Sequence, residues 1–211
     1  MSIPKHKVFI SYYHNDDQHY KNHLLYLNHL YDIFDDYSVH EDDIDDTNLT
    51  SEQIRRIIRD DYIRDASVLI LLCGENTKTR KHIDWEIHAA MYDSPINHKM
   101  GILVINLPSI YGKQSTRAAS NEEKKYIADE TARWYSIHTI DEYNQDYPYM
   151  PDRIIDSFIK GSEISVVDWE RIERNPNILK YLIDCAFVRR KYVNYDDSRH
   201  LRRKNSTKVS V

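Results

Sequence analysis

Three short apolar runs, separated by segments with helical periodicity, constrain the fold most strongly. Ser67–Cys73 is an unbroken run rich in branched residues, and Gly74 follows it directly. Gly101–Leu107 has the same character, and Lys7–Ser11 is a shorter run near the start of the chain. A strand that is covered on both faces reads as such an unbroken run, whereas a half-exposed strand alternates. The sequence therefore predicts three buried strands of a parallel sheet.

The segments between these runs have the spacing of amphipathic helices. Apolar residues recur at helical intervals from about His19 to Asp35 and again from about Arg80 to Tyr92. Thr50 and Gln53 form the pattern of a capping box at the start of another helix. Strands that alternate with helices are joined by right-handed crossovers. We therefore expect an α/β fold with a doubly wound, mostly parallel sheet and a C-terminal helical extension.

The regular alternation ends near Pro108. A chain of 211 residues can bury one sizeable core with a small appendage. We expect residues 1–110 to form the α/β core and residues 111–190 to form an insertion and a final helix that pack on it. Residues 191–211 form a basic polar tail, expected to be solvated or docked on the chain itself. Because residues 200–211 have few apolar side chains, their removal is expected to leave the core folded.

Composition excludes several classes of function. The net charge is −5 at pH 7, whereas a protein that tracks nucleic-acid phosphates normally has a basic excess, so nucleic acid is an unexpected partner. The chain has only four glycines, and they form neither the GxGxxG fingerprint nor the phosphate loop. Ordinary dinucleotide oxidoreductases and P-loop NTPases are therefore excluded.

Hydropathy and cysteine usage predict a cytoplasmic protein. No apolar run approaches the roughly 18 residues that a membrane span needs, so no membrane partner is expected. Cys73 lies in an apolar run and Cys185 in a helical pattern. Both are expected to be small buried side chains rather than parts of a disulfide or metal framework, which fits a reducing compartment.

An acidic segment covers residues 35–46 and surrounds Tyr37–His40, which could form a brief second strand. Its possible metal ligands are His40, Glu41, Asp42 and Asp43. The calcium-loop pattern is absent, and charge runs of this sort are usually solvated, so we expect no metal site. A phosphorylation switch of the receiver type would fit the fold, but Cys73 and Gly74 occupy the strand end where the acceptor aspartate would be expected.

Two segments carry candidate chemistry. The first strand ends in Ser11 and Tyr12, at the sheet edge where crevices form in open α/β folds. On the helix from residue 80, His82, Trp85 and Glu86 share a face beside the apolar stripe. A glutamate there is partly desolvated, which strengthens its binding to the hydroxyls and the cationic group of a substrate. Alternatively, the helix dipole favours a first-turn glutamate, and Trp85 is ordinary packing.

Four motifs together resemble the TIR superfamily, most closely the TIR-like proteins of the bacterial Thoeris antiphage system. They are Phe9–Tyr12, the acidic loop before a capped helix, Leu69–Cys73 and Thr79–Glu86. The resemblance covers residues 5–107, and Met150–Asp156 and Val166–Glu170 look like an extension found in this branch. It implies a flavodoxin-like sheet.

In catalytic TIR domains, a glutamate on the helix after the third strand is essential for NAD cleavage, and Glu86 matches it. The resemblance implies an NAD glycohydrolase or ADP-ribosyl cyclase that uses NAD as substrate and no other cofactor. Its product would be a cyclic or conjugated ADP-ribose signal for a separate antiphage effector, and a homo-oligomer or a phage-derived trigger would activate it. The expected substrate-binding residues are Ser11, Tyr12, His82 and Trp85. The alternative is a catalytically silent TIR-like adaptor that binds protein partners.

Overall fold

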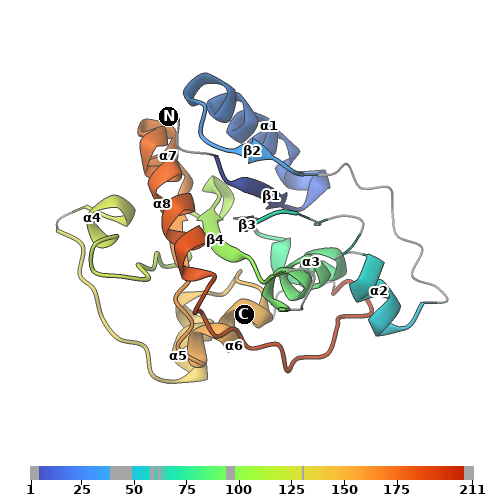
Figure 1. The fold of residues 1–211 in the computed structure, drawn as a ribbon. Helices are drawn as coiled ribbons and strands as arrows, with labels where there is room; N and C mark the ends of the chain where they lie inside the picture. The colour runs from blue at the N-terminus through green and yellow to red at the C-terminus, as the bar shows by residue number, and fades with distance from the viewer. Residues whose placement is uncertain are drawn as a thin grey trace.

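A single parallel sheet organises the molecule. The computed structural model describes residues 5–38, 49–57, 60, 63, 65–93, 98–129 and 131–206. Its five-stranded sheet has the order β2-β1-β3-β4-β5 (Figure 1). The strands are β1 (Lys7–Ser11), β2 (Asp35–Asp36), β3 (Val68–Cys73), β4 (Gly101–Asn106) and β5 (Ser165–Asp168). All four strand pairs are parallel, so the predicted α/β fold with a doubly wound, flavodoxin-like sheet is confirmed.

Helices cover both faces of this sheet (Figure 1). One face carries α1 (His14–Tyr31), α7 (Trp169–Arg174) and α8 (Pro176–Arg189). The other carries α3 (Lys81–Met91), α5 (Ile140–Asp146) and α6 (Asp152–Ile159), with α2 (Ser51–Ile57) beside α3. The short α4 (Lys124–Ile127) lies near β5. None of the helices among the described residues is long and apolar enough to cross a membrane.

Alternation along β1 decides which side chains face which layer. Val8 and Ile10 join the apolar cluster under α1 and α8, whereas Phe9 joins the cluster under α3 and α6. Successive side chains of a strand point to opposite faces. Ser11, two residues after Phe9, therefore points toward α3.

The strand β5 was missed by the sequence analysis. It pairs with β4 from Leu103↔Ser165 to Asn106↔Asp168, so residues from the segment after 110 form the edge of the same sheet as β1. A four-residue strand with two apolar side chains gives too weak a periodic signal to be recognised. The predicted second strand also differs: β2 precedes Tyr37, and Val39 and His40 lie outside the described residues.

A buried polar cluster ties β5 to α8. Arg189 of α8 donates hydrogen bonds to the carboxylate of Glu123 and, at 3.0 Å, to the hydroxyl of Ser165. The Ser165 hydroxyl in turn donates to Glu123. All three side chains are buried, and a buried charge is tolerated only when it is paired in this way. The last helix is therefore fixed to the sheet edge by charge as well as by apolar packing.

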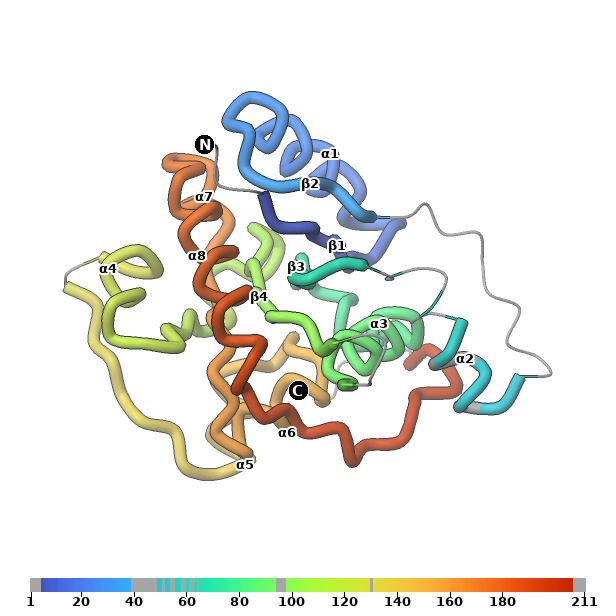
Figure 2. Tube along the Cα trace, viewed as in Figure 1, coloured from blue at the N-terminus to red at the C-terminus, as the bar shows by residue number. Residues whose placement is uncertain are grey.

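The described part of the basic tail, which ends at Ser206, is docked on the chain itself. After α8 the chain runs past α6 toward α3 and α2 (Figure 2). Val193 and Tyr195 are buried in the α3-side cluster, and the Tyr195 hydroxyl donates to the carbonyl oxygen of Met100 at 3.0 Å. The sequence left two states open for this segment, solvated or docked on the chain itself. The structure shows the docked state as far as Ser206, whose N–H donates to the carbonyl oxygen of Thr79.

Candidate functional site

The candidate site lies where the strand order reverses. The chain passes from β1 outward to β2 and then returns to the other side of β1 for β3, so the carboxyl ends of β1 and β3 flank the switch point. Ligands of open α/β sheets bind in the crevice at this position. Ser11 ends β1 in register with Leu71 of β3. After β3, the 3-10 turn Thr77–Thr79 reverses the chain, and α3 then passes beside the end of β1.

Ser11 and Glu86 meet at this edge. The Ser11 hydroxyl donates a hydrogen bond to Oε2 of Glu86 at 2.6 Å. The exposed fraction is 1% for Ser11 and 6% for Glu86. A hydrogen bond to a carboxylate is short and strong, and it fixes the direction of the acceptor. The contact joins residues 75 positions apart and orients the carboxylate of α3 toward the first strand.

Tyr12 does not lie with Ser11. Its ring packs against the cluster on the α1 side of the sheet, and its hydroxyl donates to Oε1 of Gln18 at 2.7 Å. The ammonium group of Lys21 lies 5.2 Å from the ring centroid. The expectation that Tyr12 lines the same crevice as Ser11 is therefore wrong, because neighbouring residues at a strand end point to opposite faces.

Tyr13 takes the place on the α3 side and was missed. Its ring packs against the cluster that contains Phe9, and the guanidinium carbon of Arg80 lies 3.8 Å from the ring centroid. Arg80 directly precedes α3. The signal was present in the sequence, since Phe9, Ser11 and Tyr13 are spaced two apart and share one face of an extended chain.

Trp85 is buried and faces the tail. It is 1% exposed, and its indole Nε1 donates to the carbonyl oxygen of Arg202 at 2.7 Å. The half-buried His82 ring lies 4.9 Å from the indole in an edge-to-face arrangement. The indole therefore presents no open face to a substrate, contrary to the expectation that Trp85 binds substrate. The helical spacing suggested that Trp85 lies on an outer face of α3, but the docked tail covers that face.

A buried ion pair braces α3. Arg153 of α6 is completely buried, and its Nε and Nη2 donate to the two carboxylate oxygens of Asp84 at 3.1 and 3.2 Å. The same guanidinium donates to the carbonyl oxygens of Arg199 and His200. The backbone N–H of Arg202 donates to Asp84 at 2.9 Å. Asp84 is two residues from Glu86, so this network sets the position of the helix that carries the candidate carboxylate.

The tail also caps the start of α3. Residue Arg80 at the N-cap makes no side-chain cap, but Oδ1 of Asn205 accepts a hydrogen bond from the backbone N–H of Lys81 at 2.9 Å. The first N–H groups of a helix lack partners within the helix, and a side-chain oxygen that accepts from one of them stabilises the helix. Here that oxygen comes from 124 residues further along the chain.

Asp17 is a second buried carboxyl group near this edge. It is 4% exposed, and its buried Oδ2 has no hydrogen-bond partner in the described part of the chain. Burial and, secondarily, the charge of Asp16 raise the pKa of Asp17 to about 7. The carboxyl group lies against Gly74, where an added Cβ would be 2.9 Å from both of its oxygens. Glycine at position 74 therefore leaves the space that this carboxyl group occupies.

No metal site is found within the residues that the structure describes. The segment His40–Asp43, which the sequence offers as a source of ligands, lies outside them. Cys73 and Cys185 are free thiols; Cys73 is buried as predicted, whereas Cys185 is only half-buried. Burial raises the pKa of the Cys73 thiol to about 12, so this group is a neutral packing element.

Comparison with protein-family models finds a match over residues 9–111 to the family described as Thoeris protein ThsB, TIR-like domain. This segment contains Ser11, Asp84 and Glu86. A comparison with curated proteins finds no match.

Deletion of residues 200–211 should destabilise the protein, contrary to the expectation from the tail's low apolar content. The deletion removes the partner of the Trp85 indole, the cap of α3 and one carbonyl acceptor of Arg153. We expect a loss of roughly 3 kcal/mol, visible as a lower Tm. Asn205→Ala should cost only about 1 kcal/mol, because it removes the cap alone. Lys204→Ala, at an exposed neighbouring position, is the matched control and should leave Tm unchanged. A truncated protein that melts like the full chain would show that the docked tail contributes no stability.

Asp17→Asn should stabilise the protein at pH 8 more than at pH 5. The pKa of Asp17 is about 7 in the folded chain against 3.8 for an unperturbed group. Because the folded state binds this proton more tightly, stability falls as the pH rises from about 4 to about 7 and stays lower above that. The amide removes this loss, a gain on the order of 1 kcal/mol at pH 8 after allowance for partial solvation. Thermal melts at both pH values measure it. The exposed Asp197→Asn should change Tm equally at both pH values, and the same behaviour of Asp17→Asn would refute the assignment.

Proposed function

Residues 9–111 belong to the TIR-like domain family of the Thoeris protein ThsB, and on that premise we propose that the chain is an NAD-consuming enzyme of antiphage defence. The proposed reaction is cleavage of the bond between nicotinamide and ribose, with Glu86 as the catalytic residue. The observation that supports it most directly is the buried hydrogen bond between Ser11 and Glu86 at the switch point of the sheet.

The chemistry of this bond requires little more than a positioned carboxylate. When the bond between C1′ of the ribose and the pyridinium nitrogen breaks, its electron pair goes to nitrogen and nicotinamide leaves as a neutral molecule. The sugar becomes an oxocarbenium-like cation. A fixed carboxylate stabilises that charge and accepts hydrogen bonds from ribose hydroxyls, as carboxylates do in glycoside hydrolysis. No general acid is needed for the departure of nicotinamide.

Ser11 is proposed to position this carboxylate. Its hydroxyl donates to Oε2 and so fixes the direction in which the carboxylate points. The carboxylate is thereby held in place before substrate binds, which lowers the cost of organising the transition state. Tyr13 replaces Tyr12 as the aromatic side chain proposed to flank the substrate, since it lies on the α3 side.

The burial of Glu86 fits an enzyme that is held in a resting state. At 6% exposure, the carboxylate is barely accessible to a ligand of the size of NAD. We propose that assembly of copies of the chain, or a phage-derived trigger, moves the edge formed by Tyr13 and Arg80 and admits NAD. The Arg80 guanidinium packs on the Tyr13 ring, and this contact joins the segment after β1 to the start of α3.

The same burial favours one product over another. Once the edge closes again over bound NAD, few water molecules reach the sugar cation, so capture by another bound nucleophile competes well with hydrolysis. We propose that the product is a cyclic or conjugated ADP-ribose derivative that acts on a separate effector protein.

A second candidate function rests on the same geometry. A buried glutamate that accepts a short hydrogen bond also fits a structural contact between α3 and β1, as in a catalytically silent adaptor that binds protein partners. The two functions differ in the effect expected when the charge of Glu86 is removed: only the enzyme should lose nicotinamide release.

Glu86→Gln should abolish nicotinamide release while the protein stays folded, because the amide keeps the shape and loses the charge that stabilises the sugar cation. We expect a loss of about a hundredfold or more. The assay follows nicotinamide from NAD with phage-infected lysate added, against lysate alone. The matched control is Glu163→Gln, an exposed glutamate outside this edge, which should retain activity. Unchanged turnover by Glu86→Gln with a normal melting curve would favour the adaptor function.

The products decide the signalling part of the proposal. Chromatography with mass spectrometry of active mixtures should show that most consumed NAD becomes a cyclised or conjugated ADP-ribose rather than free ADP-ribose. A protein-free filtrate of the mixture should activate the effector. If free ADP-ribose and nicotinamide account for all of the consumed NAD, the signalling proposal is wrong even though Glu86 is catalytic.

A further inference from the structure

A cavity of about 600 Å³ lies beside the outer edge of β5, in the segment between β4 and α6. Its walls come from residues 115–121, 124, 128, 132–137, 143, 146 and 147. We propose that this cavity binds a small anionic ligand that carries an aromatic ring, of the chemical class of a mononucleotide. The proposal is independent of the NAD reaction and of Glu86.

The size of the cavity suits such a ligand. Sites for small molecules typically enclose about 300–1,000 Å³, and this cavity lies within that range. Its floor is anchored to the sheet, because Arg117 and Val166 of β5 exchange backbone hydrogen bonds at 2.9 and 2.8 Å. The cavity is therefore built on the rigid edge of the main sheet.

The charge of the lining is positive. Arg117, Lys124 and Arg133 line the cavity together with one carboxylate, that of Asp146. Asp146 already accepts a hydrogen bond from the Tyr135 hydroxyl. Among the described residues, none of the three cations forms an ion pair. Cations gathered without carboxylate partners attract an anion.

Arg117 contributes a fixed positive charge to the cavity wall. Its guanidinium carbon lies 4.6 Å from the centroid of the Phe158 ring, which holds the group flat against the core. Its buried Nε has no hydrogen-bond partner in the described part of the chain. Its Nη2 donates to the carbonyl oxygen of Ser162 at 3.5 Å, so the group is held in place and acts on an anion in the cavity through its charge rather than through the buried Nε.

An aromatic face lies next to a cation. The half-buried Trp134 lines the cavity, and the ammonium group of Lys124 lies 5.5 Å from its ring centroid. A planar ring that stacks on Trp134 brings its attached phosphate close to Lys124. Stacking on aromatic side chains combined with cationic contacts to phosphate is how proteins hold nucleotides without a glycine-rich loop.

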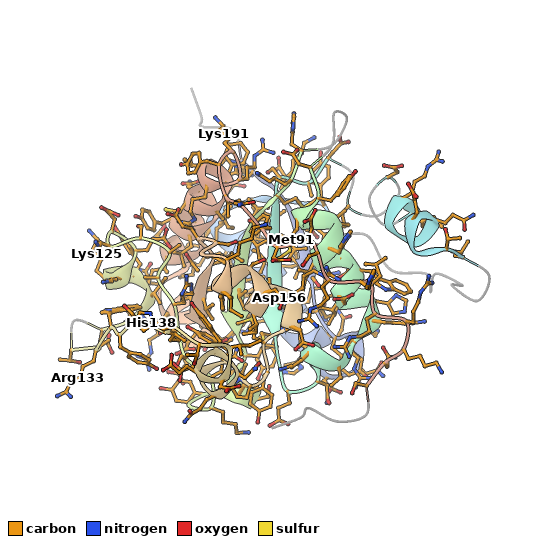
Figure 3. All side chains as sticks on the ribbon, turned by 90° about the horizontal axis from the view of Figure 1, so that it is seen from below. Met91, Lys125, Arg133, His138, Asp156 and Lys191 are labelled. Atoms are coloured by element: carbon orange, nitrogen blue, oxygen red, sulfur yellow. The ribbon has the colours of Figure 1, made fainter. Side chains whose placement is uncertain are left out.

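The cavity is separate from the Glu86 site. Its edge strand β5 is three strand spacings of about 4.8 Å from β1, or roughly 14 Å. Figure 3 shows Arg133 at one side of the molecule, well away from Met91 at the end of α3. A ligand in this cavity therefore leaves the crevice at Ser11 and Glu86 unoccupied.

Calorimetric titration of the full chain with AMP tests the proposal, with adenosine and inorganic phosphate as separate probes. We expect AMP to bind at least about tenfold more tightly than either probe, since only AMP uses both the ring and the cations. Lys124→Gln and Arg133→Gln should each weaken AMP binding by about fivefold to tenfold. The matched control is Lys180→Gln, which changes an exposed lysine of α8 outside this cavity and should bind AMP as the wild type does. Melting curves confirm that each variant is folded.

Three results would overturn the proposal. The first is no heat of binding with AMP at millimolar concentration. The second is equal binding of phosphate and AMP, which would mark an anion site without recognition of a ring. The third is loss of AMP binding in Glu86→Gln with retention in Lys124→Gln, which would place AMP at the α3 edge instead. Retention of AMP binding by Glu86→Gln supports the separate site, whether or not the proposed NAD reaction proves correct.

Discussion

The buried pair of Arg153 and Asp84 is the interaction on which the rest of the α3 side depends. A guanidinium that is completely shielded from water is tolerated only if its donors are satisfied, and here a carboxylate of α3 and two carbonyl groups of the tail satisfy them. Helix α6, helix α3 and the tail must therefore be buried together. Loss of any one of the three leaves a charge or a polar group unpaired, which is more costly than the loss of an ordinary apolar contact.

The segment that matches the family is shorter than the part of the chain that is buried together with it. The family match covers residues 9–111, yet the sheet in that segment is completed by β5, and its helix α3 is braced by α6 and the tail. The second buried network, which joins Arg189 to Glu123 and Ser165, fixes the final helix to the same sheet. The pair of Arg153 and Asp84 thus fastens the second half of the chain to the first, and the second cluster holds the second half together around β5. The short TIR-like segment therefore depends for its burial on the second half of the chain.

Sequence patterns predicted the parts of the fold that have a strong periodic signal. The strands β3 and β4 are buried throughout, so their unbroken apolar runs were unambiguous. The family resemblance placed Ser11 and Glu86 in one crevice, and the structure joins them by a hydrogen bond. Trp85 was misplaced because helical periodicity separates a covered face from an outer one, whereas α3 is buried from Ile83 to Met91. Nothing local in the sequence shows that a polar tail, held by hydrogen bonds to backbone groups, covers the outer face.

The cap on α3 links the candidate site to the direction of protein synthesis. Lys81 emerges from the ribosome long before Asn205, and the two are joined by a hydrogen bond across 124 positions. Until residue 205 has been made, the first turn of α3 lacks this cap and Trp85 lacks its acceptor on Arg202. Contacts between residues so distant in sequence form late in folding. A nascent chain therefore carries Glu86 on an incompletely braced helix, and the arrangement that orients its carboxylate is completed only after translation has passed the tail.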